Sequence, residues 1–380
     1  MKKILFISHE SSRTGAPFML LYFLQWLKEK HPEIHFVLLS LYNGGLSKEF
    51  KEVAYEYYDF SRITNTKPTF IQRWQRKVFR KLEINYHHRD AKKDFIDDLS
   101  RRDFNIIYSN TTVSLSLAQR IKLKKNKSKL ILHVHELESE IKRTIGDFRP
   151  YVDNIDFVIA ASEMVKDNLI VNHQVPAHKI QVVYEFTKKP ETSDKLKKNK
   201  KVFKVGGSGK FGHRKGTDLF IQVARYLEDN YSEFDIEFTW VGLVPEADKE
   251  SLDLELEKLG LKNDIHFVGE VEKPESYFED FDVFLMTSRE DPFPLVCIEA
   301  GMLGIPIICF DKATGISEII ENKGGFIVPY LNIEAMAERI KFYFNNPIKR
   351  VEHSNFNRKE FAKFTACQKG TEILKILERL

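Results

Sequence analysis

Short, continuously apolar runs are the feature that most limits how this chain can fold. They are rich in β-branched residues and show little polar alternation, which is typical of strands buried on both faces of a parallel sheet. Helical patterns lie between them, for example at 16–29, 218–229 and 333–344. Alternating strands and helices indicate doubly wound α/β sheets. The expected strands are Ile4–Ser8, His35–Ser40, Asn105–Ser109, Lys129–His135, Asp156–Ala161, Ile180–Tyr184, Val202–Val205, Ile236–Val241, Ile265–Val268, Asp282–Met286, Pro306–Phe310 and Gly325–Val328.

Residues 187–201 divide these runs into two groups of six. The segment reads TKKPETSDKLKKNKK, without apolar periodicity, as an exposed linker does. A length of 380 residues also suits two domains. We therefore predict two Rossmann-like domains, residues 1–186 and 202–355, with parallel sheets that face each other across a cleft. Residues 67–100 interrupt the alternation of strands and helices, and we predict that they form a basic helical insertion in the first domain.

Bulk charge and cysteine usage narrow the class of partner. The net charge is only +4, so the chain is no polycation built for nucleic acid, and we predict no nucleic-acid partner. The three cysteines are widely spaced and form no CxxC. They predict reduced thiols of a cytosolic protein and neither a disulfide framework nor a zinc site.

Localisation is predicted from the same runs. The N-terminal run is too short for a signal peptide, and no stretch nears the roughly 18 apolar residues of a membrane span. We expect a cytoplasmic protein. The basic segment 73–93, with Trp74 and Phe79, fits either a solvated helical face or an anionic membrane contact. Our hypothesis is peripheral contact with the inner face of the cell membrane.

The turns that follow strands are where open α/β sheets bind ligands, often at helix N-termini. The first is SHESSRTGAP, residues 8–17. Gly15 would let the backbone approach a ligand closely, and Thr14 suits an N-cap. A plain surface connection is the alternative. After 129–135 comes HVHE, in which His135 is a catalytic candidate or a structural histidine. This motif is weak as a metal site.

A glycine-rich turn, GGSGKFGHRKGTD, opens the second half at 206–218. It matches GxGxxG, but a basic insert precedes the helix, and no acidic residue clearly ends the next strand as a dinucleotide site requires. It lacks GxxxxGK[ST] as well, so it is no P-loop. A phosphate site for a ligand other than NAD or ATP and a purely structural turn both stay open.

The segment with the strongest signal of a site is TSREDPFPLVCIEA, residues 287–300, in which three carboxylates surround a turn and the start of a helix. We predict that a helix begins near Pro294, which puts Glu299 about one and a half turns into an otherwise apolar helix. A carboxylate buried there needs a partner, and ribose hydroxyls are suitable donors. The alternative is an exposed glutamate.

Together these segments resemble the retaining glycosyltransferases of family 4, which have the two-domain GT-B fold. The resemblance rests on Asp291, seven residues, then Glu299, followed by GMLGIPII, on the RKG turn at 214–216, and on the late GISEI and GGFIVP segments. SHESSRTGAP and HVHELE are similar to one bacterial branch. The match spans nearly the whole chain.

The resemblance implies roles for particular residues. Glu299 would bind the donor ribose, Lys215 the diphosphate and Asp291 a sugar hydroxyl. His135 would lie beside the transferred sugar, and residues 356–380 would return to the first domain as a helix. The implied catalytic residues are His135, Lys215, Glu290 and Asp291. The implied donor-binding residues are Gly15, Gly209, Lys210, Arg214, Lys215, Phe293, Pro294, Leu295 and Glu299.

This chain also departs from the family pattern. The signature carboxylate is usually a glutamate where Asp291 stands, so whether Asp291 or Glu290 acts is open. Pro294 replaces a common glycine and removes a backbone donor. Gly209 stands where the family often has arginine, whose charge Lys210 or Arg214 could replace.

The resemblance implies a retaining transfer from a nucleoside-diphosphate sugar to a glycan or lipid-linked glycan in cell-surface polysaccharide or glycolipid synthesis. It implies that residues 1–186 bind the acceptor and residues 202–355 bind the nucleotide sugar. It implies no metal and no cofactor besides the nucleotide sugar as co-substrate. A nucleotide-sugar epimerase or hydrolase, with His9, Glu10 and Glu136 as acid and base, is one alternative. A non-catalytic sugar-nucleotide-binding protein is another. The donor base and sugar, the acceptor, the linkage and the oligomeric state are not readable from the residues.

Overall fold

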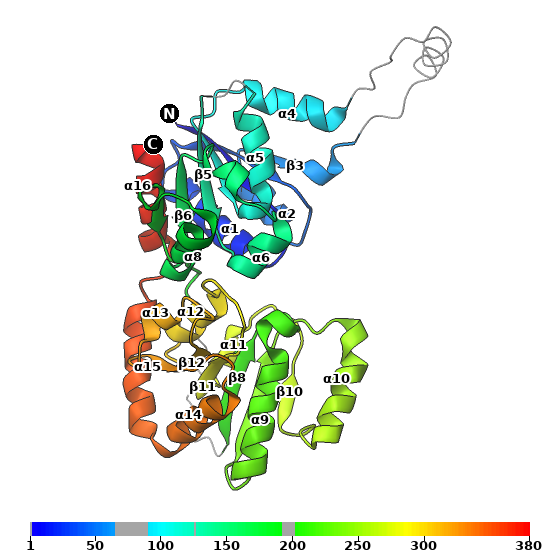
Figure 1. The fold of residues 1–380 in the computed structure, drawn as a ribbon, viewed down its shortest axis with the longest axis vertical. Helices are drawn as coiled ribbons and strands as arrows, with labels where there is room; N and C mark the ends of the chain where they lie inside the picture. The colour runs from blue at the N-terminus through cyan, green and yellow to red at the C-terminus, as the bar shows by residue number, and fades with distance from the viewer. Residues whose placement is uncertain (1, 65–89, 125–126, 192–201) are drawn as a thin grey trace, which may run out of the picture. The chain divides into compact units, whose positions relative to one another are not determined.

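The computed structural model describes residues 2–64, 90–124, 127–191 and 202–380 (Figure 1). Contacts divide the chain into two compact units. The first unit contains Met1–Val134, Thr144–Ile159 and Leu377–Leu380, and the second contains His135–Arg143 and Ala160–Ile376. Residues 65–89, most of the expected insertion and of the 73–93 segment, lie outside the described residues, so membrane contact stays a prediction.

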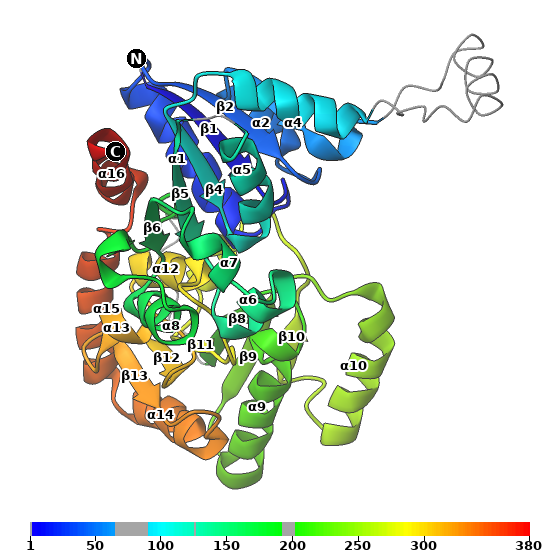
Figure 2. The ribbon, with the colours of Figure 1, turned by 45° about the horizontal axis from the view of Figure 1, so that its top comes forward.

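The first sheet has seven strands in the order β3-β2-β1-β4-β5-β6-β7. Strand β1 pairs in parallel with β2 on one side and β4 on the other, and these strands run beside one another in Figure 2. The strands are β1 (Lys3–Ser8), β2 (His35–Ser40), β3 (Glu56–Asp59), β4 (Ile106–Asn110), β5 (Lys129–Val134), β6 (Phe157–Ala160) and β7 (Ile180–Val182).

The helices of this half of the chain alternate with its strands. Helix α1 begins at Gly15 and buries an aliphatic and aromatic face that includes Leu20, Phe23 and Leu27. Phe23 meets Phe6 of β1 edge to face, with ring centroids 6.1 Å apart. The helices are α1 (Gly15–Lys30), α2 (Ser47–Val53), α4 (Ala91–Arg101), α5 (Leu115–Lys122), α6 (Glu138–Thr144), α7 (Arg149–Val152) and α8 (Glu163–His173).

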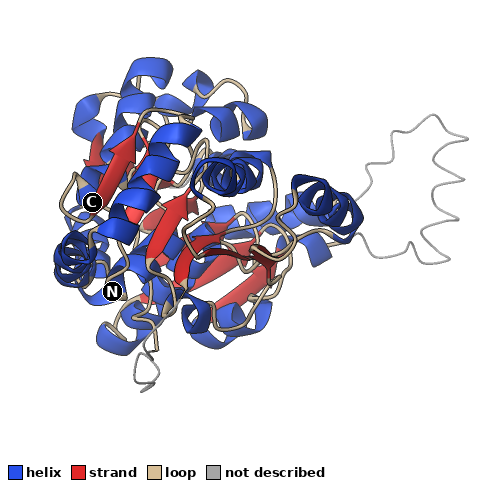
Figure 3. Ribbon diagram, turned by 90° about the horizontal axis from the view of Figure 1, so that it is seen from below, coloured by secondary structure: helices blue, strands red, loops and turns tan. Residues whose placement is uncertain are grey.

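The second sheet has six strands in the order β10-β9-β8-β11-β12-β13, and all of its pairs are parallel. Figure 3 shows the strands of the protein in red with helices in blue about them. The strands are β8 (Phe203–Ser208), β9 (Ile236–Val241), β10 (Ile265–Phe267), β11 (Val283–Met286), β12 (Ile307–Phe310) and β13 (Gly325–Val328).

Aromatic and aliphatic side chains fill the core of this second sheet. Phe220 of α9 meets Trp240 of β9 edge to face at 5.1 Å, and α9 packs beside α14. The helices are α9 (Thr217–Tyr231), α10 (Glu246–Leu259), α11 (Glu275–Phe278), α12 (Leu295–Met302), α13 (Ser317–Ile320), α14 (Ile333–Asn345), α15 (Pro347–Phe361) and α16 (Thr371–Arg379). The last turn of α16 lies against the chain start, where Lys2 Nζ donates to the carbonyls of Leu377 and Glu378 at 2.6 Å.

The prediction of two doubly wound parallel sheets is confirmed, and each of the twelve expected strands is present. Strand β3 was not predicted, because its sequence EYYD is half-exposed and lacks an apolar run. Among the described residues, no helix combines the length and the apolar character that crossing a membrane requires.

Candidate functional site

The order of the strands reverses at the centre of the second sheet, and this is the place where open α/β sheets bind ligands. Strand β8 lies between β9 and β11, so the chain leaves β8 toward one edge and returns to β11 on its other side. Val205 of β8 pairs with Val283 of β11. The turns that follow these two strands therefore start side by side, and they contain residues 209–216 and 287–294.

The glycines of the 206–216 segment serve two different purposes. A Cβ at Gly206 would lie 1.9 Å from the Phe281 ring, and one at Gly207 would lie 2.7 Å from the Trp240 ring. Both glycines are therefore required by packing within β8. Gly209 has a φ of 146°, and its carbonyl accepts a hydrogen bond from Trp240 Nε1 at 2.8 Å. Packing thus explains why Gly206 and Gly207 are glycines. The turn itself begins at Gly209.

An arginine joins the two turns. Arg289 Nη1 and Nη2 donate to the two carboxylate oxygens of Asp218 at 2.9 and 2.7 Å, and Nη1 also donates to the His213 carbonyl at 2.6 Å. The backbone N–H of Arg289 donates to the Arg214 carbonyl at 2.9 Å. A two-pronged arginine–carboxylate contact fixes orientation as well as distance. Arg289 therefore holds the basic turn at 213–216 against the turn after β11.

Gly216 lies close to the turn after β11. We expect Gly216→Ala to lower the free energy of unfolding by about 2 to 5 kcal/mol, from left-handed strain plus overpacking. Its φ is 68°, and an added Cβ would lie 1.9 Å from the Thr287 carbonyl oxygen. Gly260→Ala is the matched control, because Gly260 has a φ of 72° but its Cβ would meet no described atom within 4 Å. Urea unfolding of both variants measures the difference. Equal losses of stability would contradict the contact with Thr287.

Lys215 and Asp291 meet where the two turns come together. Lys215 Nζ contacts Asp291 Oδ2, and Arg214 Nη1 lies 3.9 Å from the same oxygen. The side chains of Lys215 and Asp291 are 19% and 9% exposed, so this ion pair is largely withdrawn from water. A ligand that carries both a phosphate and hydroxyl groups could take the cation and the carboxylate at the same time.

Glu290, the neighbouring carboxylate, makes a different contact. Its Oε1 and Oε2 accept from the backbone N–H of Ser139 at 3.1 and 3.4 Å. Arg214 Nη1 donates to the backbone carbonyl of Glu290 at 2.9 Å, not to its side chain. Of the two carboxylates that the sequence left open, only Asp291 therefore lies beside Lys215 in the described residues.

Glu299 lies in the second turn of α12 and is only partly exposed. Burial raises the pKa of Glu299 to about 7, although a hydrogen bond from Thr187 favours the charged form. Thr187 Oγ1 donates to Glu299 Oε1 at 3.2 Å. A carboxyl group in this environment gains from additional hydroxyl donors, because they stabilise its ionised form.

The other residues of the 293–295 stretch have structural contacts of their own. The Phe293 ring packs against Tyr184 and Phe364, with centroids 4.9 and 5.5 Å away. Pro294 occupies the N-cap position of α12, and Leu295 is the first residue of that helix, as predicted. Lys210 is exposed at the start of the glycine-rich turn.

His135 follows directly after β5. Its Nδ1 contacts Glu185 Oε1, and its backbone N–H donates to Glu136 Oε2 at 2.9 Å. Burial alone would lower the pKa of His135, but the carboxylate of Glu185 raises it above the ordinary value. The Glu185 partner lies 50 residues away in the chain, so the HVHE motif gave no sign of it. His133, by contrast, is buried and shares a 2.6 Å hydrogen bond with Tyr108.

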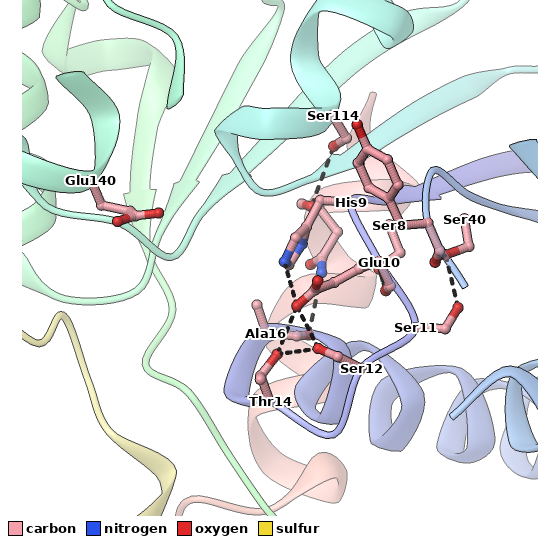
Figure 4. Close-up of polar contacts among 12 residues, drawn as sticks. Ser8, His9, Glu10, Ser11, Ser12, Thr14, Ala16, Ser40, Ser114 and Glu140 are labelled. Carbon is pink, nitrogen blue, oxygen red and sulfur yellow. Dashed lines mark hydrogen bonds and ion pairs between the residues drawn. The ribbon is translucent and has the colours of Figure 1, made fainter. Parts of the chain in front are cut away.

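Figure 4 shows the turn after β1 in the first unit. Its side chains gather around Glu10, whose Oε1 lies 3.3 Å from His9 Nε2. Gly15 begins α1, and an added Cβ there would meet no described atom within 4 Å. Packing therefore does not require a glycine at position 15, and the space beside it is open.

Two family models match the chain. Residues 188–360 match the model described as glycosyl transferases group 1, and residues 15–187 match glycosyltransferase family 4. The two matches meet within the segment that the sequence predicts as a linker.

Similar proteins have been found by sequence and by structure. An uncharacterized glycosyltransferase of Haemophilus influenzae is 26% identical over 161 residues, 42% of this chain and 44% of that protein. The poly(ribitol-phosphate) alpha-N-acetylglucosaminyltransferase of Staphylococcus aureus is 30% identical over 151 residues, 39% of this chain and 29% of that protein. The matched region thus spans less than half the length of both relatives. Anabaena Alr3699/HepE, solved in complex with UDP-glucose, has a TM-score of 0.79 at 18% identity, with 100% of each chain covered.

Proposed function

The chain belongs to the GT-B glycosyltransferases of the family 4 and group 1 type, and we propose that it transfers a sugar from a nucleoside-diphosphate sugar to a glycan or lipid-linked glycan acceptor. The observation that carries this proposal is the meeting of Lys215 and Asp291 at the paired turns after β8 and β11. Glu299, on the helix after the second turn, supplies a third group of the kind that a nucleotide sugar needs.

Each group has a task in the proposed reaction. Lys215 binds the diphosphate, and Arg214 adds a second cation beside it. Asp291, released from Lys215, accepts hydrogen bonds from hydroxyls of the donor sugar. Glu299 accepts hydrogen bonds from the ribose. This division follows from charge, because the departing diphosphate gains negative charge in the transition state and preorganised cations stabilise it.

The bonds change at one carbon. The bond from the anomeric carbon to the diphosphate oxygen breaks, its electron pair leaves with the diphosphate, and the acceptor oxygen bonds to that carbon. The acceptor hydroxyl loses its proton to the leaving phosphate or to solvent. We propose that the new bond forms on the face from which the diphosphate leaves, so that the anomeric configuration is retained. Proton NMR of the first product formed tests this, and an inverted anomer would refute retention.

The acceptor class is proposed from the relatives. The Staphylococcus aureus relative is named for transfer of N-acetylglucosamine to poly(ribitol-phosphate). We propose an acceptor of the same broad kind, a cell-surface polysaccharide or glycolipid under assembly. The proposed reaction needs no cofactor besides the nucleotide sugar, and the cations Lys215 and Arg214 take the part that a metal would play.

Thermal shift with a panel of nucleoside diphosphates and nucleotide sugars tests the donor site. A ligand at about one hundred times its Kd adds about 2.7 kcal/mol of stability, which a melting curve resolves easily. We expect one base to be preferred, with the shift lost in Lys215→Ala and in Glu299→Ala. The shift should be kept in Lys258→Ala, at an exposed lysine of α10 outside the two turns. If no nucleotide shifts a well-folded sample, the transferase proposal fails.

Product analysis then separates the alternative activities. The native protein is incubated with the preferred donor, first alone and then with an acceptor extract of cell-surface glycans. A transferase gives a new glycoside only with the acceptor. An altered sugar nucleotide without acceptor would indicate an epimerase, rapid release of free sugar would indicate a hydrolase, and donor binding without any product would indicate a binding protein.

A further inference from the structure

A residue from a distant part of the chain holds the carboxylate of Glu299. Thr187 Oγ1 donates to Glu299 Oε1 at 3.2 Å, although 112 residues separate the two in sequence. Glu299 lies in the second turn of α12, and Thr187 lies in the segment that follows β7. The other oxygen of Glu299, Oε2, has no hydrogen-bond partner among the residues that the structure describes. The hydroxyl of Thr187 therefore fixes one carboxylate oxygen and leaves the other to a ligand.

Thr187 is itself held in place by its surroundings. Its backbone N–H donates to the carbonyl of Phe364 at 3.2 Å, and the residue is only 3% exposed. Tyr184 of the same segment packs against Phe293 and Phe364, with ring centroids 4.9 and 5.9 Å away. Packing and a second hydrogen bond of this kind preorganise a side chain that supports a binding residue. The hydroxyl of Thr187 thus needs no rearrangement to reach its partner.

The surroundings of Glu299 disfavour its charged form. Burial, opposed by the hydrogen bond from Thr187 and assisted by the carboxylate of Glu275 on α11, raises the pKa of Glu299 to about 7. At neutral pH the carboxyl group is therefore close to the midpoint of its titration. Near a midpoint, a single hydrogen bond to the ionised form has a large effect on the fraction that is charged.

Three further titratable groups belong to the segments around Glu299. Cys297 lies on the same helix, and burial holds the pKa of its thiol well above the ordinary value, so this thiol is neutral. Arg358 of α15 meets the residues that follow α12, and the exposed Lys188 follows Thr187 in the chain. Thr187 is the group that favours the ionised carboxylate through a hydrogen bond to it.

We propose that Thr187 is a positioning residue for the donor, and that its hydroxyl keeps the carboxylate of Glu299 ionised and oriented toward the ribose of the nucleotide. Thr187 does not contact the ribose itself and acts through Glu299. Ribose hydroxyls bind an ionised carboxylate more strongly than a neutral carboxyl group, so the hydrogen bond from Thr187 raises the affinity for the nucleotide. This inference rests on the proposed function, because it deepens the role given there to Glu299.

Isothermal titration calorimetry on the full chain tests this role with two forms of each ligand. The probes are UDP, GDP and ADP and their 2′,3′-dideoxy counterparts, which lack both ribose hydroxyls. The ratio of the dideoxy Kd to the ribonucleotide Kd measures the recognition of the ribose hydroxyls, since both forms carry the same base and diphosphate. We expect the ratio for the best ribonucleotide to be at least about 10 in the native chain at pH 7, as for a hydrogen bond to a charged group.

Thr187→Val keeps the shape of the side chain and removes its hydroxyl. At pH 7 the ratio should fall about 5- to 50-fold, with 1 as its lower limit, because the ionised fraction of Glu299 falls from about one half to about one tenth or one hundredth. Higher pH restores the ionised form, so the ratio should recover toward the native value by about pH 9. The affinity for the dideoxy form should stay as in the native chain.

The control variants separate the hydroxyl of Thr187 from its packing. Thr187→Ser keeps the hydroxyl and should retain a ratio near the native one, and Thr187→Ala replaces Thr187→Val if the latter does not fold. Thr239→Val is the matched control, because Thr239 is a buried threonine of β9 and its loss should leave the ratio unchanged. In a Glu299→Gln background, Thr187→Val should have no further effect, because the hydroxyl acts through the Glu299 carboxylate.

The outcomes distinguish this inference from the proposed function. If a nucleotide binds and Thr187→Val keeps the native ratio at pH 7, or weakens the two forms equally, the role of Thr187 is refuted while the donor site stands. A ratio that falls as far in Thr187→Ser as in Thr187→Val, or that does not recover at high pH, refutes it as well. If the native chain binds none of the nucleotides, the donor proposal fails and this inference fails with it.

Discussion

Replacing Lys215 with methionine should lower kcat/KM for sugar transfer about 10²- to 10³-fold, the usual effect of removing one donor to a developing negative charge. Methionine retains the length and apolar stem of lysine, so the change is mainly one of charge. The reason is that Lys215 Nζ occupies the junction of the turns after β8 and β11, where the proposed diphosphate binds. Steady-state kinetics with the preferred donor measure the loss.

The same variant should also affect the unliganded protein. Without Lys215, Asp291 is left nearly buried, and Arg214 at 3.9 Å is its remaining cationic neighbour among the residues that the structure describes. We expect a loss of about 1 to 3 kcal/mol in the free energy of unfolding, as for a buried acceptor that loses its partner. Lys258→Met is the matched control, because Lys258 is an exposed lysine of α10, outside the two turns. Activity of Lys215→Met near the native value, in a folded sample, would remove Lys215 from the donor site.

Glu299→Gln should change how stability depends on pH. Burial raises the pKa of Glu299 in the folded protein from an ordinary 4.5 to about 7. Between these values the unfolded chain has released the proton while the folded protein retains it. The native state therefore loses stability as pH rises from 4.5 to 7, by up to about 3 kcal/mol. Glutamine does not titrate. The free energy of unfolding of the variant, relative to that of the native protein, should therefore rise by that amount between pH 4 and pH 8.

Urea unfolding of both proteins across this pH range gives the comparison directly. Glu255→Gln on α10 is the control, because Glu255 is exposed and its loss should leave the native pH profile in place. A constant difference between Glu299→Gln and the native protein at every pH would contradict a raised pKa for Glu299. Adding the preferred nucleotide should reduce the pH dependence of the native protein, since ribose hydroxyls would stabilise the ionised carboxylate.

Much of the fold was predictable because each strand that is buried on both faces has a continuous apolar run of its own. Runs such as ILFIS before the first turn and FVLLS at 36–40 need no distant residue to be recognised. The same holds for the start of α12 after Pro294, where a proline precedes an apolar helix. Strand β3 escaped prediction because its side chains are half-exposed at the edge of a sheet, where the apolar pattern is weak.

The turns of the proposed donor site were predictable as segments of sequence, but their geometry was not. Their position after strands, their glycines and their charges all lie within short stretches of sequence. That Gly206 and Gly207 are packing glycines required knowledge of Phe281 and Trp240, which contact them from other strands and turns. A glycine-rich motif can therefore contain glycines that packing requires and glycines that a turn requires. Only the contacts in the folded structure distinguish the two.

By itself the sequence determined the alternation of strands and helices and which turns contain charge and glycine, because each is a property of consecutive residues. Tertiary structure alone decided which groups meet. Lys215 faces Asp291 across 76 residues, Arg289 faces Asp218 across 71, and Thr187 faces Glu299 across 112. The tertiary structure also shows that the partner of Lys215 is Asp291, while Glu290 contacts Ser139. The physical reason is that hydrogen bonds and ion pairs depend on distances of a few ångströms, and strand pairing, not chain order, sets those distances.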